Sequence, residues 1–375
     1  MPPIRIALAG VGNCASALAQ GLAYYAIAPP RPIRAGARHH PLRPVDLLHP
    51  RIGPYTPGDI TVVAAFDVDA RKVGRPLDAA IRALPNCATP FLPRLPRSRV
   101  RVQMGPILDG IAPHMRRYPT EQTFIPSRAR PVDVARVLKN AGAEILLNYV
   151  PVGAQRATEA YAAACLEAKV SLLNCIPVFI ASDPQWAERF ARAGLPLIGD
   201  DVKGQVGATI LHRALARLFT ERGAAIDRTY QLNIGGNTDF LNMLNQDRLR
   251  LKKISKTEAV QSVLAAPLPE ASIHIGPSDY VPWQRDRKVC FLRIEGRGFG
   301  DCPIELEAKL SVEDSPNSAA MTIDAIRCLR LARDRGLRGP VSSVCAWTMK
   351  HPPEPMTDEQ ARQHMDEFIH GLRDR

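Results

Sequence analysis

The sequence lacks any run of about 18 consecutive apolar residues, so no segment is expected to span a membrane. It also lacks the charged and then apolar start of a signal peptide, because residues 1–5 lead directly into a strand-like stretch. We therefore expect a cytoplasmic protein. Aromatic residues make up only 6% of the 375 residues and charged residues 23%, whereas 46% are hydrophobic. This composition argues against a disordered chain and suffices for the cores of two or three domains.

Paired cysteine motifs and internal repeats are also missing. The eight cysteines form no CxxC, and none stands at zinc-ligand spacing from a histidine. We predict free thiols that mostly fill the core, without a disulfide framework. The pair His39 and His40 lies in an arginine- and proline-rich stretch with no acids or cysteines in a ligand pattern, so we expect no metal site there.

The net charge of +12 could indicate a nucleic-acid partner, so its location matters. Residues 29–57 hold five arginines and one acid, and residues 85–131 hold eight arginines and two acids. These two segments carry ten of the twelve surplus charges and 17 of the 34 prolines. The surplus thus lies in proline-rich stretches and not on a face where basic and aromatic residues alternate. We expect solvated loops and no nucleic-acid partner; a polyanion site is the alternative.

Apolar strands and helical segments alternate over the first 223 residues, which predicts a parallel, doubly wound sheet of the Rossmann type. The expected strands cover 4–9, 60–66, 144–150, 170–175 and 197–199. The expected helices cover 17–28, 68–83, 132–140, 154–168, 183–192 and 206–223, while residues 29–58 and 85–131 are expected to be irregular.

The pattern changes near residue 229. Segments 230–234, 289–294 and 304–310 alternate like strands with one open face, and a helix is expected over 315–335. We therefore expect a second, α+β domain over residues 205–313. Residues 1–204 and 314–375 would form the nucleotide-binding domain.

A glycine turn after the first strand predicts a dinucleotide site. Gly10 and Gly12 stand between strand and helix, where the backbone can approach a pyrophosphate at a helix N-terminus. Ala15 occupies the third glycine position of the pattern. Asp67 ends the second strand and is the expected ribose acceptor, although it lies 57 residues past Gly10 instead of about 20. We attribute the excess to a loop inserted at 29–58. A glycine turn without a ligand remains the alternative.

Charged residues accompany glycine or proline in several later segments. Residues 199–204 (GDDVKG) contain Asp201 and Gly204 where a strand gives way to a helix, and residues 233–239 (NIGGNTD) end at Asp239. Asp314 opens the expected C-terminal helix, and Lys350 precedes a Pro-Pro turn. Taken singly, each segment is also compatible with ordinary capping and turn chemistry.

Lys252 and Lys256 are four residues apart and would share one face of a continuous helix. The pattern Ser255-Lys-Thr-Glu258 is also a capping box, so a helix could begin at Ser255 instead. In either case, two lysines near a helix start would suit a phosphorylated substrate. A solvated run of charge is the alternative.

Taken together, these segments resemble the myo-inositol-1-phosphate synthase family, in its shorter, prokaryotic branch. The resemblance covers nearly the whole chain and is weakest in residues 29–58 and 85–131. It rests on the blocks GVGNCAS (10–16), AAFDVD (64–69), NYVPVG (148–153), IPVFIASDP (176–184), GDDVKGQVGATI (199–210), QLNIGGNTDFLNML (231–244), KKISKTEAV (252–260), HIGPSDYVPW (274–283), LRIEGRGFGDCPIELEAKL (292–310), DSPNSA (314–319) and MKHPPE (349–354).

The resemblance implies an NAD-dependent isomerase that converts D-glucose 6-phosphate to 1D-myo-inositol 3-phosphate, the first step of inositol biosynthesis. It implies oxidation at C5, enolisation, aldol closure onto C1 and return of the hydride, in a homotetramer joined through the second domain. The catalytic residues implied are Lys252, Lys256, Lys288, Lys350, Asp201 and Asp314. The cofactor-binding residues implied are Gly10, Gly12, Asn13, Cys14, Ala15, Asp67, Asn148, Tyr149, Pro151, Asp201, Gly204, Asp239 and Lys252. No metal is implied.

One residue departs from the family pattern: Gly204 stands where a serine is usual, so one hydroxyl donor is lost and a backbone N–H remains. Activity should survive, with an altered cofactor affinity. Two other functions stay open. A simple dehydrogenase of the aspartate-semialdehyde or homoserine type would release reduced cofactor and would not need four lysines. A non-catalytic regulator that binds NAD or phosphate would not need to retain them.

Overall fold

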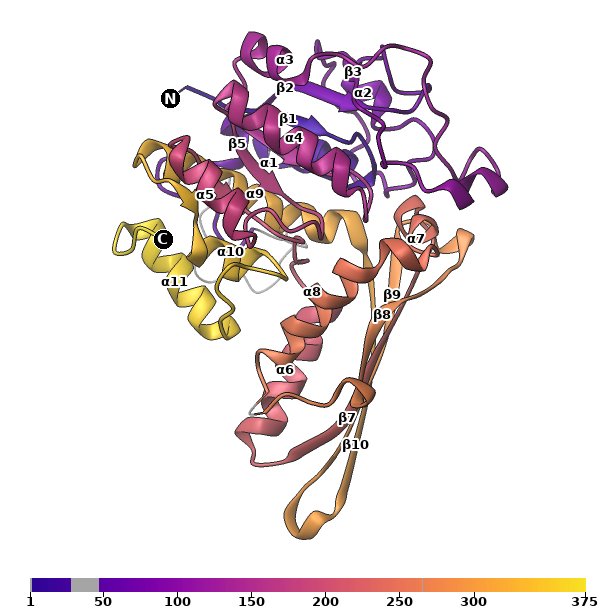
Figure 1. Ribbon diagram of the computed structural model, residues 1–375, viewed down its shortest axis with the longest axis vertical. Coiled ribbons are helices and arrows are strands. Elements are labelled where there is room, and N and C mark those ends of the chain that lie inside the picture. Colours follow the sequence, from indigo (N-terminus) through magenta and orange to yellow (C-terminus); the bar gives the residue numbers. More distant parts are fainter. Residues whose placement is uncertain (1, 28–46, 265) are drawn as a thin grey trace, which may run out of the picture.

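Two sheets organise the computed structural model, which describes residues 2–27, 47–264 and 266–375 (Figure 1). The larger sheet has seven parallel strands in the order β11-β6-β5-β4-β1-β2-β3. Their bounds are β1 (Ile4–Ala9), β2 (Ile60–Asp67), β3 (Val102–Met104), β4 (Ile145–Asn148), β5 (Ser171–Asn174), β6 (Pro196–Ile198) and β11 (Gly339–Pro340). The strand order reverses between β1 and β4, which is where such sheets bind ligands. The predicted α/β class is confirmed.

Helices cover both faces of this sheet, which explains the nearly unbroken apolar runs of its strands. Ile4, Ile6 and Leu8 of β1 belong to one core, and Ala7 and Ala9 belong to the opposite core. The first core includes side chains of α1 (Asn13–Ile27), α9 (Asp314–Asp334), α10 (Ser342–Thr348) and α11 (Asp358–His370). The second includes side chains of α3 (Val134–Ala141), α4 (Gln155–Ala168) and α5 (Pro184–Arg192).

The second sheet is mixed and has the order β10-β9-β7-β8. Its strands are β7 (Ala225–Gly235), β8 (Ile273–Tyr280), β9 (Arg287–Arg297) and β10 (Pro303–Glu313), with β8 parallel to β7 and the other pairs antiparallel. α6 (Ala208–Glu221) packs against β7 and β9, and α8 (Arg250–Gln261) packs against β8. The long strands extend away from the first sheet, and no described helix lies on their other face (Figure 1).

The predicted helix over 68–83 is wrong for most of its length. Residues 68–76 form turns, and only α2 (Leu77–Ala80) is helical in the segment expected to be a helix over 68–83. Gly74 has φ +83° and Pro76 has no N–H to donate, so this stretch cannot continue as one helix. Of the two alternatives for Lys252 and Lys256, the continuous helix is correct, because α8 runs without a break from Arg250 and does not begin at Ser255.

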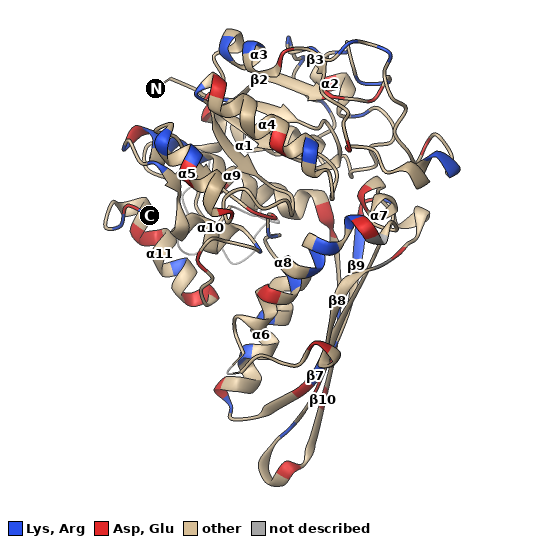
Figure 2. Ribbon diagram, viewed as in Figure 1, with Lys and Arg blue, Asp and Glu red and all other residues tan. Residues whose placement is uncertain are grey.

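Residues 85–131 are mostly irregular as expected, but they also contribute the edge strand β3. All eight arginines of this segment are exposed, as solvated loops require (Figure 2). Most of the expected insert at 29–58, with His39 and His40, lies outside the described residues. The cysteines are free thiols, five of them buried. No helix among the described residues is both long and apolar enough to cross a membrane.

Short elements complete the described chain. α7 (Thr238–Asn242) follows β7. The 3-10 helices cover Pro57–Asp59, Pro113–Arg117, Gln246–Arg248, Glu270–Ser272, Pro282–Gln284 and Phe299–Asp301.

Candidate active site

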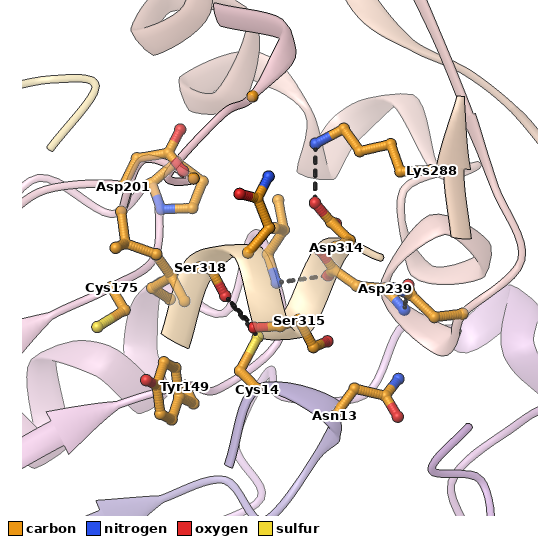
Figure 3. Close-up of a pocket in the computed structure, with 18 of the residues that line it drawn as sticks. Asn13, Cys14, Tyr149, Cys175, Asp201, Asp239, Lys288, Asp314, Ser315 and Ser318 are labelled. Atoms are coloured by element: carbon orange, nitrogen blue, oxygen red, sulfur yellow. Dashed lines mark hydrogen bonds and ion pairs between the residues drawn. The ribbon is translucent and has the colours of Figure 1, made fainter. Parts of the chain in front are cut away.

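A cavity of about 1290 Å³, its open mouth included, lies between the ends of the strands of the first sheet and the second sheet (Figure 3). Its wall combines residues that follow β1, β4, β5 and β6 with residues of α8, β9 and α9. Thirteen of the predicted site residues line it: Gly12, Asn13, Cys14, Tyr149, Pro151, Asp201, Gly204, Asp239, Lys252, Lys256, Lys288, Asp314 and Lys350. The fold therefore gathers residues that are up to 338 positions apart (12 to 350) around one space.

The glycine turn is shaped for close approach of a ligand. Gly10 has φ +95°, and a Cβ on it would lie 2.6 Å from the carbonyl oxygen of Tyr149. A Cβ on Gly12 would meet nothing within 4 Å, so this residue faces open space at the start of α1. A helix N-terminus with an open backbone in front of it favours a phosphate group. The turn thus fits the pyrophosphate of a dinucleotide.

Cys14 is a protonated thiol at the bottom of the cavity. Ser318 donates a hydrogen bond to its Sγ atom at 3.9 Å. Burial, together with Asp286 and Asp314, raises the pKa of Cys14 to about 12. A thiol held protonated is not a nucleophile near neutral pH. Cys14 therefore contributes shape and a soft surface to the site.

Asp67 does not line the cavity, and its carboxylate instead bonds the backbone of the glycine turn. One carboxylate oxygen accepts a hydrogen bond from the N–H of Val11 at 2.8 Å. The other accepts from the N–H groups of Val68 and Asp69 at 2.7 and 2.8 Å. The ammonium of the buried Lys72 lies 3.7 Å from the first oxygen. These bonds hold the middle of the turn in place.

Three more predicted cofactor residues lie behind the cavity wall. Ala15 is fully buried in the core on the α1 side. Asn148 is fully buried, and its amide donates to Thr158 at 3.2 Å and to Asn174 at 2.9 Å. Gly10 lies against the backbone of Tyr149. The structure thus places Gly10, Ala15, Asp67 and Asn148 where they shape the site without lining it.

Two distant segments pair to bring Lys350 into the cavity. The N–H of Lys350 donates to the carbonyl oxygen of Asp201 at 2.7 Å, and Asp200 and His351 exchange backbone hydrogen bonds at 3.0 and 3.1 Å. Lys203 N–H donates to Thr348 at 2.8 Å. Residues 200–203 and 348–351 therefore run antiparallel beside one another.

Asp201 bonds two lysines and a serine at the centre of the site. Its Oδ1 accepts from the ammonium groups of Lys252 at 2.8 Å and Lys350 at 2.9 Å. Its Oδ2 accepts from the hydroxyl of Ser255 at 2.8 Å. Burial alone would raise the pKa of Asp201, but the two ammonium groups hold it well below its usual value. Because α8 is continuous, Lys252, Ser255 and Lys256 all face this side of the helix.

Lys288 and Asp314 form a second pair on the opposite wall. The ammonium of Lys288 donates to Asp314 at 3.1 Å (Figure 3). Burial would raise the pKa of Asp314, but Lys288 lowers it below the usual value. Behind this pair, Asp286 accepts from Asn237 at 3.1 Å and from the Ser315 hydroxyl at 2.9 Å. Burial, together with Asp314, raises the pKa of Asp286 to about 7.

The lysines differ in how well their charge is balanced. Lys256 is only 3% exposed, and no described residue accepts a hydrogen bond from its ammonium. Burial lowers its pKa well below the usual value, and Lys288, Lys252 and Lys350 lower it further. Burial also lowers the pKa of Lys350 to about 8, with Asp201 opposing the shift. Burial would lower the pKa of Lys252 as well, but Asp201 and Asp239 raise it above its usual value.

This arrangement can stabilise anions and move a proton. An unbalanced ammonium in a buried site binds a phosphate or a developing oxyanion strongly, because little water competes for it. A lysine with a pKa near 8 is partly neutral at physiological pH and can accept a proton. No group of acids, cysteines and histidines among the described residues is arranged to hold a metal ion.

Sequence reasoning missed two side chains of the site. Ser255 was considered only as a possible helix start, whereas its hydroxyl bonds Asp201. Asp286 has no local signal beyond its place two residues before Lys288, and its partner Ser315 is 29 positions away. Neither role follows from local sequence, because each depends on contacts between distant segments.

Comparison with known proteins places these residues in a wider context. The sequence profile of the family described as "Myo-inositol-1-phosphate synthase" matches residues 207–315. The chain is 49% identical over 372 residues to an inositol-3-phosphate synthase of Mycolicibacterium smegmatis, with 98% of both chains covered. It is 50% identical over 368 residues to the inositol-3-phosphate synthase of Mycobacterium tuberculosis, covering 98% of this chain and 96% of the relative. The crystal structure of Ari2 matches with a TM-score of 0.76 and 34% identity, covering 98% of this chain and 99% of that one.

Proposed function

The chain belongs to the myo-inositol-1-phosphate synthase family, and from this premise we propose how its cavity performs the reaction. The protein converts D-glucose 6-phosphate to 1D-myo-inositol 3-phosphate. The observation that carries the proposal is the convergence of Lys252, Lys256, Lys288 and Lys350 on one cavity beside the glycine turn. A simple dehydrogenase or a binding protein does not need four ammonium groups in one water-poor space.

We propose NAD as the cofactor, which accepts a hydride from the sugar and later returns it. The open face of Gly12 and the start of α1 would hold its pyrophosphate. Asn13, Tyr149 and Pro151 would line its path toward the lysines. The same cavity is lined by the glycine turn and by the lysines, so cofactor and sugar phosphate would lie beside one another in it.

Lys350 is the base proposed for the sugar hydroxyl that is oxidised. With a pKa of about 8 it can be neutral at physiological pH, and its bond to Asp201 Oδ1 fixes its position. Lys252 shares that oxygen and remains charged, so it can stabilise the oxygen from which the proton leaves. Asp201 thereby positions both groups, and Ser255 holds its other oxygen.

Lys256 and Lys288 are proposed to bind the phosphate and the oxyanions of enolisation and ring closure. Lys256 has no anionic partner within hydrogen-bonding distance, and a dianionic substrate would supply one. Lys288 is held by Asp314 on the facing wall, so an anion between the two lysines would contact both. Exclusion of water by the buried walls strengthens these contacts.

The reaction is tested with purified protein, glucose 6-phosphate and NAD. We expect an inositol phosphate as product, and no net accumulation of reduced cofactor over many turnovers, because the hydride is returned. Reduced cofactor that accumulates in step with substrate loss would instead identify a simple dehydrogenase. Binding of both ligands without any product would identify a regulator.

NAD should be preferred over NADP, because the negative charge of Asp67, held beside the glycine turn by backbone N–H groups, repels a 2′-phosphate near the end of β2. Asp67→Asn keeps the shape of the side chain and removes its charge, so it should narrow the preference, measured as the ratio of the two dissociation constants. Asp183→Asn, at the exposed start of α5, is the matched control. Equal binding of NAD and NADP by the unaltered protein would contradict the proposal that Asp67 discriminates against the 2′-phosphate of NADP.

We propose that residues 1–204 and 314–375 form the cofactor-binding domain and that residues 205–313 form the catalytic and tetramerisation domain. The four-stranded sheet supports this division, because its face opposite α6 and α8 has no described helix on it and carries Phe291. A homotetramer would cover that face. We also propose a cytoplasmic location, since a phosphorylated sugar does not cross membranes unaided.

A further inference from the structure

The turns over residues 68–76 carry a buried lysine that the proposed reaction does not use. Lys72 lies shortly after the end of β2, and its side chain is fully buried. Lysines are almost never fully buried unless they are paired, because the transfer of an ammonium group from water to a protein interior is unfavourable. The partners of Lys72 therefore indicate what it does in the molecule.

The side chain of Lys72 contacts Asn86 and Asp67, and each of these also bonds Val11. The ammonium of Lys72 donates to Asn86 Oδ1 at 2.9 Å and lies 3.7 Å from Asp67 Oδ2. The same oxygen of Asp67 accepts from the N–H of Val11 at 2.8 Å. The amide of Asn86 donates to the carbonyl oxygen of Val11 at 3.0 Å. The four residues thus form a closed ring of contacts, with Lys72 and Val11 at opposite sides.

This ring of contacts holds the middle of the glycine turn by both of its backbone polar groups. Val11 directly precedes Gly12, which faces the open space proposed for the pyrophosphate. The N–H and the carbonyl oxygen of Val11 are both bonded by side chains, so the position of the turn depends on Asp67 and Asn86. Lys72 contacts both of these side chains and thereby fixes the distance between them.

The residues after Asn86 extend the same support to the wall of the cavity. The N–H groups of Cys87 and Ala88 donate to Asn13 Oδ1 at 2.7 and 3.0 Å. Asn13 is the first residue of α1 and lines the cavity (Figure 3). By holding Asn86, Lys72 therefore also fixes the residues that bind Asn13.

We propose that Lys72 is a positioning residue for the cofactor: through Asp67 and Asn86 it holds the glycine turn in the shape that binds the pyrophosphate of NAD. The inference rests on the proposed function, because it takes NAD as the ligand. Affinity falls in proportion to the fraction of molecules in which a binding site is already ordered. Lys72 does not line the cavity, so it affects the binding of NAD and not the chemistry that follows.

The test is Lys72→Met, which removes the ammonium and keeps a side chain of similar length. We expect the dissociation constant of NAD to rise by about 10–100-fold, as for the loss of a hydrogen bond to a charged group. Bound NAD orders the turn again, so kcat at saturating NAD and the KM for glucose 6-phosphate should stay unchanged. Calorimetry measures the binding of NAD, and initial rates at varied NAD concentration separate KM from kcat.

Two further variants address the ring of contacts itself. Lys72→Gln keeps a donor for Asn86 without the charge, so its NAD affinity should lie between those of the unaltered protein and Lys72→Met. This variant also covers the case that the methionine variant does not fold. Asn86→Leu breaks the ring at another point, and the double variant with Lys72→Met should bind NAD no more weakly than the weaker single variant. Additive losses in the double variant would show two separate effects and would overturn the proposal.

Arg330→Met is the matched control, because it removes another cation with little exposure. Arg330 pairs with Asp334 and with Glu144, which directly precedes β4 and so lies at the edge of the sheet opposite the cavity. This variant should lower the melting temperature and leave the NAD affinity unchanged. The same result for Lys72→Met would show a structural role only and would overturn the proposal. NAD binding that depends on Lys72 in a protein without turnover would instead refute the proposed reaction and leave this inference standing.

Discussion

Asp201 is the residue on which the charge of the site depends. Its carboxylate bonds the ammonium groups of Lys252 and Lys350, and Asp314 bonds that of Lys288, so these acids do not balance Lys256. The surplus falls on Lys256, which has no acceptor among the described residues and a strongly lowered pKa. A positive site of this kind is unfavourable when empty and becomes favourable when a dianionic substrate enters. The unbalanced positive charge of Lys256 thus favours both the binding of the substrate and its reaction.

Replacing either Lys256 or Lys350 by methionine should reduce kcat/KM by about 10²–10³, or about 3–4 kcal/mol, because each removes a cation from a water-poor site. Neither substitution should lower the melting temperature, which serves as the second measurement. Lys139→Met, on the exposed face of α3, is the matched control and should leave kcat/KM unchanged. Near-normal turnover in both cavity variants would contradict the proposed roles.

Lys256→Met should also make the protein more stable near neutral pH. The native pKa of Lys256 lies below its unfolded value, so the native state binds fewer protons and the buried charge destabilises it below the native pKa. That cost disappears as the pH rises through the native pKa toward about 10.5. The stability gained by the substitution should therefore shrink with rising pH, as measured by urea unfolding at several pH values. A gain that is independent of pH would point to packing instead.

The dependence of kcat/KM on pH should report Lys350. As the base for the sugar hydroxyl it must be neutral, so the rate should rise with pH through a midpoint near 8. In Lys350→Arg the side chain stays protonated throughout this range, and the rise should disappear along with most of the activity. A rise that persists unchanged in the arginine variant would assign the base to another group.

At the residue scale, the sequence predicted which residues line the site better than it predicted the hydrogen bonds between them. The four lysines are spread over about 100 positions, from 252 to 350. Only Lys252 and Lys256 are related by local spacing, so the full set came from the resemblance to the family. Thirteen of the predicted site residues do line one cavity. Their hydrogen bonds could not be predicted, because Asp201 meets Ser255 only after a helix from another part of the chain has packed against it.

At the scale of elements, the start of α9 is tied to the loop after β6. Asn317 accepts from the N–H of Val206 at 2.9 Å and donates to its carbonyl oxygen at 2.8 Å. Its amide lies so close to Gly204 that a Cβ there would be 2.6 Å from Asn317 Nδ2. The glycine that departs from the family pattern thus leaves room for this clamp, which holds the loop at the cavity wall.

Gly204→Ser should therefore destabilise the protein by about 1–3 kcal/mol, because Asn317 must move to admit the new side chain. The loop would be held less firmly, and NAD should bind more weakly. Thermal unfolding and calorimetry measure the two effects. Gly58→Ser, where a Cβ would make only ordinary contacts of 3.6 Å or more, is the control. A more stable Gly204→Ser protein would show that Asn317 adapts without cost.

The elements themselves were predicted unevenly, for physical reasons. Strands buried on both faces, such as β1 and β4, show as apolar runs and were found. The apolar spacing of residues 68–76 predicted a helix. Gly74 and Pro76 interrupt this segment, which forms turns instead. β8 and β11 were not predicted at all. β8 contains a glycine and a proline, and β11 has only two residues.

At the scale of the whole molecule, the open face of the second sheet should join copies of the chain. Phe291 on this face is 38% exposed, so Phe291→Asp should shift a tetramer toward smaller species, measured by light scattering. Phe91→Asp is the matched control, because Phe91 is 39% exposed and lies outside that sheet. A tetramer that Phe291→Asp leaves intact would place the interface elsewhere.

The antiparallel pairing of residues 200–203 with residues 348–351 has a consequence for how the enzyme comes to exist in the cell. Translation proceeds from the N-terminus, so the chain carrying Asp201, Lys252, Lys256 and Lys288 emerges well before Lys350 does. Until that segment has left the ribosome, the bond between Asp201 and Lys350 cannot form. A chain that has not reached α9 also lacks part of the core that packs against β1 and α1, so neither the glycine turn nor the reactive centre is complete in it. The site therefore cannot act on its substrate before the segment that carries Lys350 has left the ribosome and paired with residues 200–203.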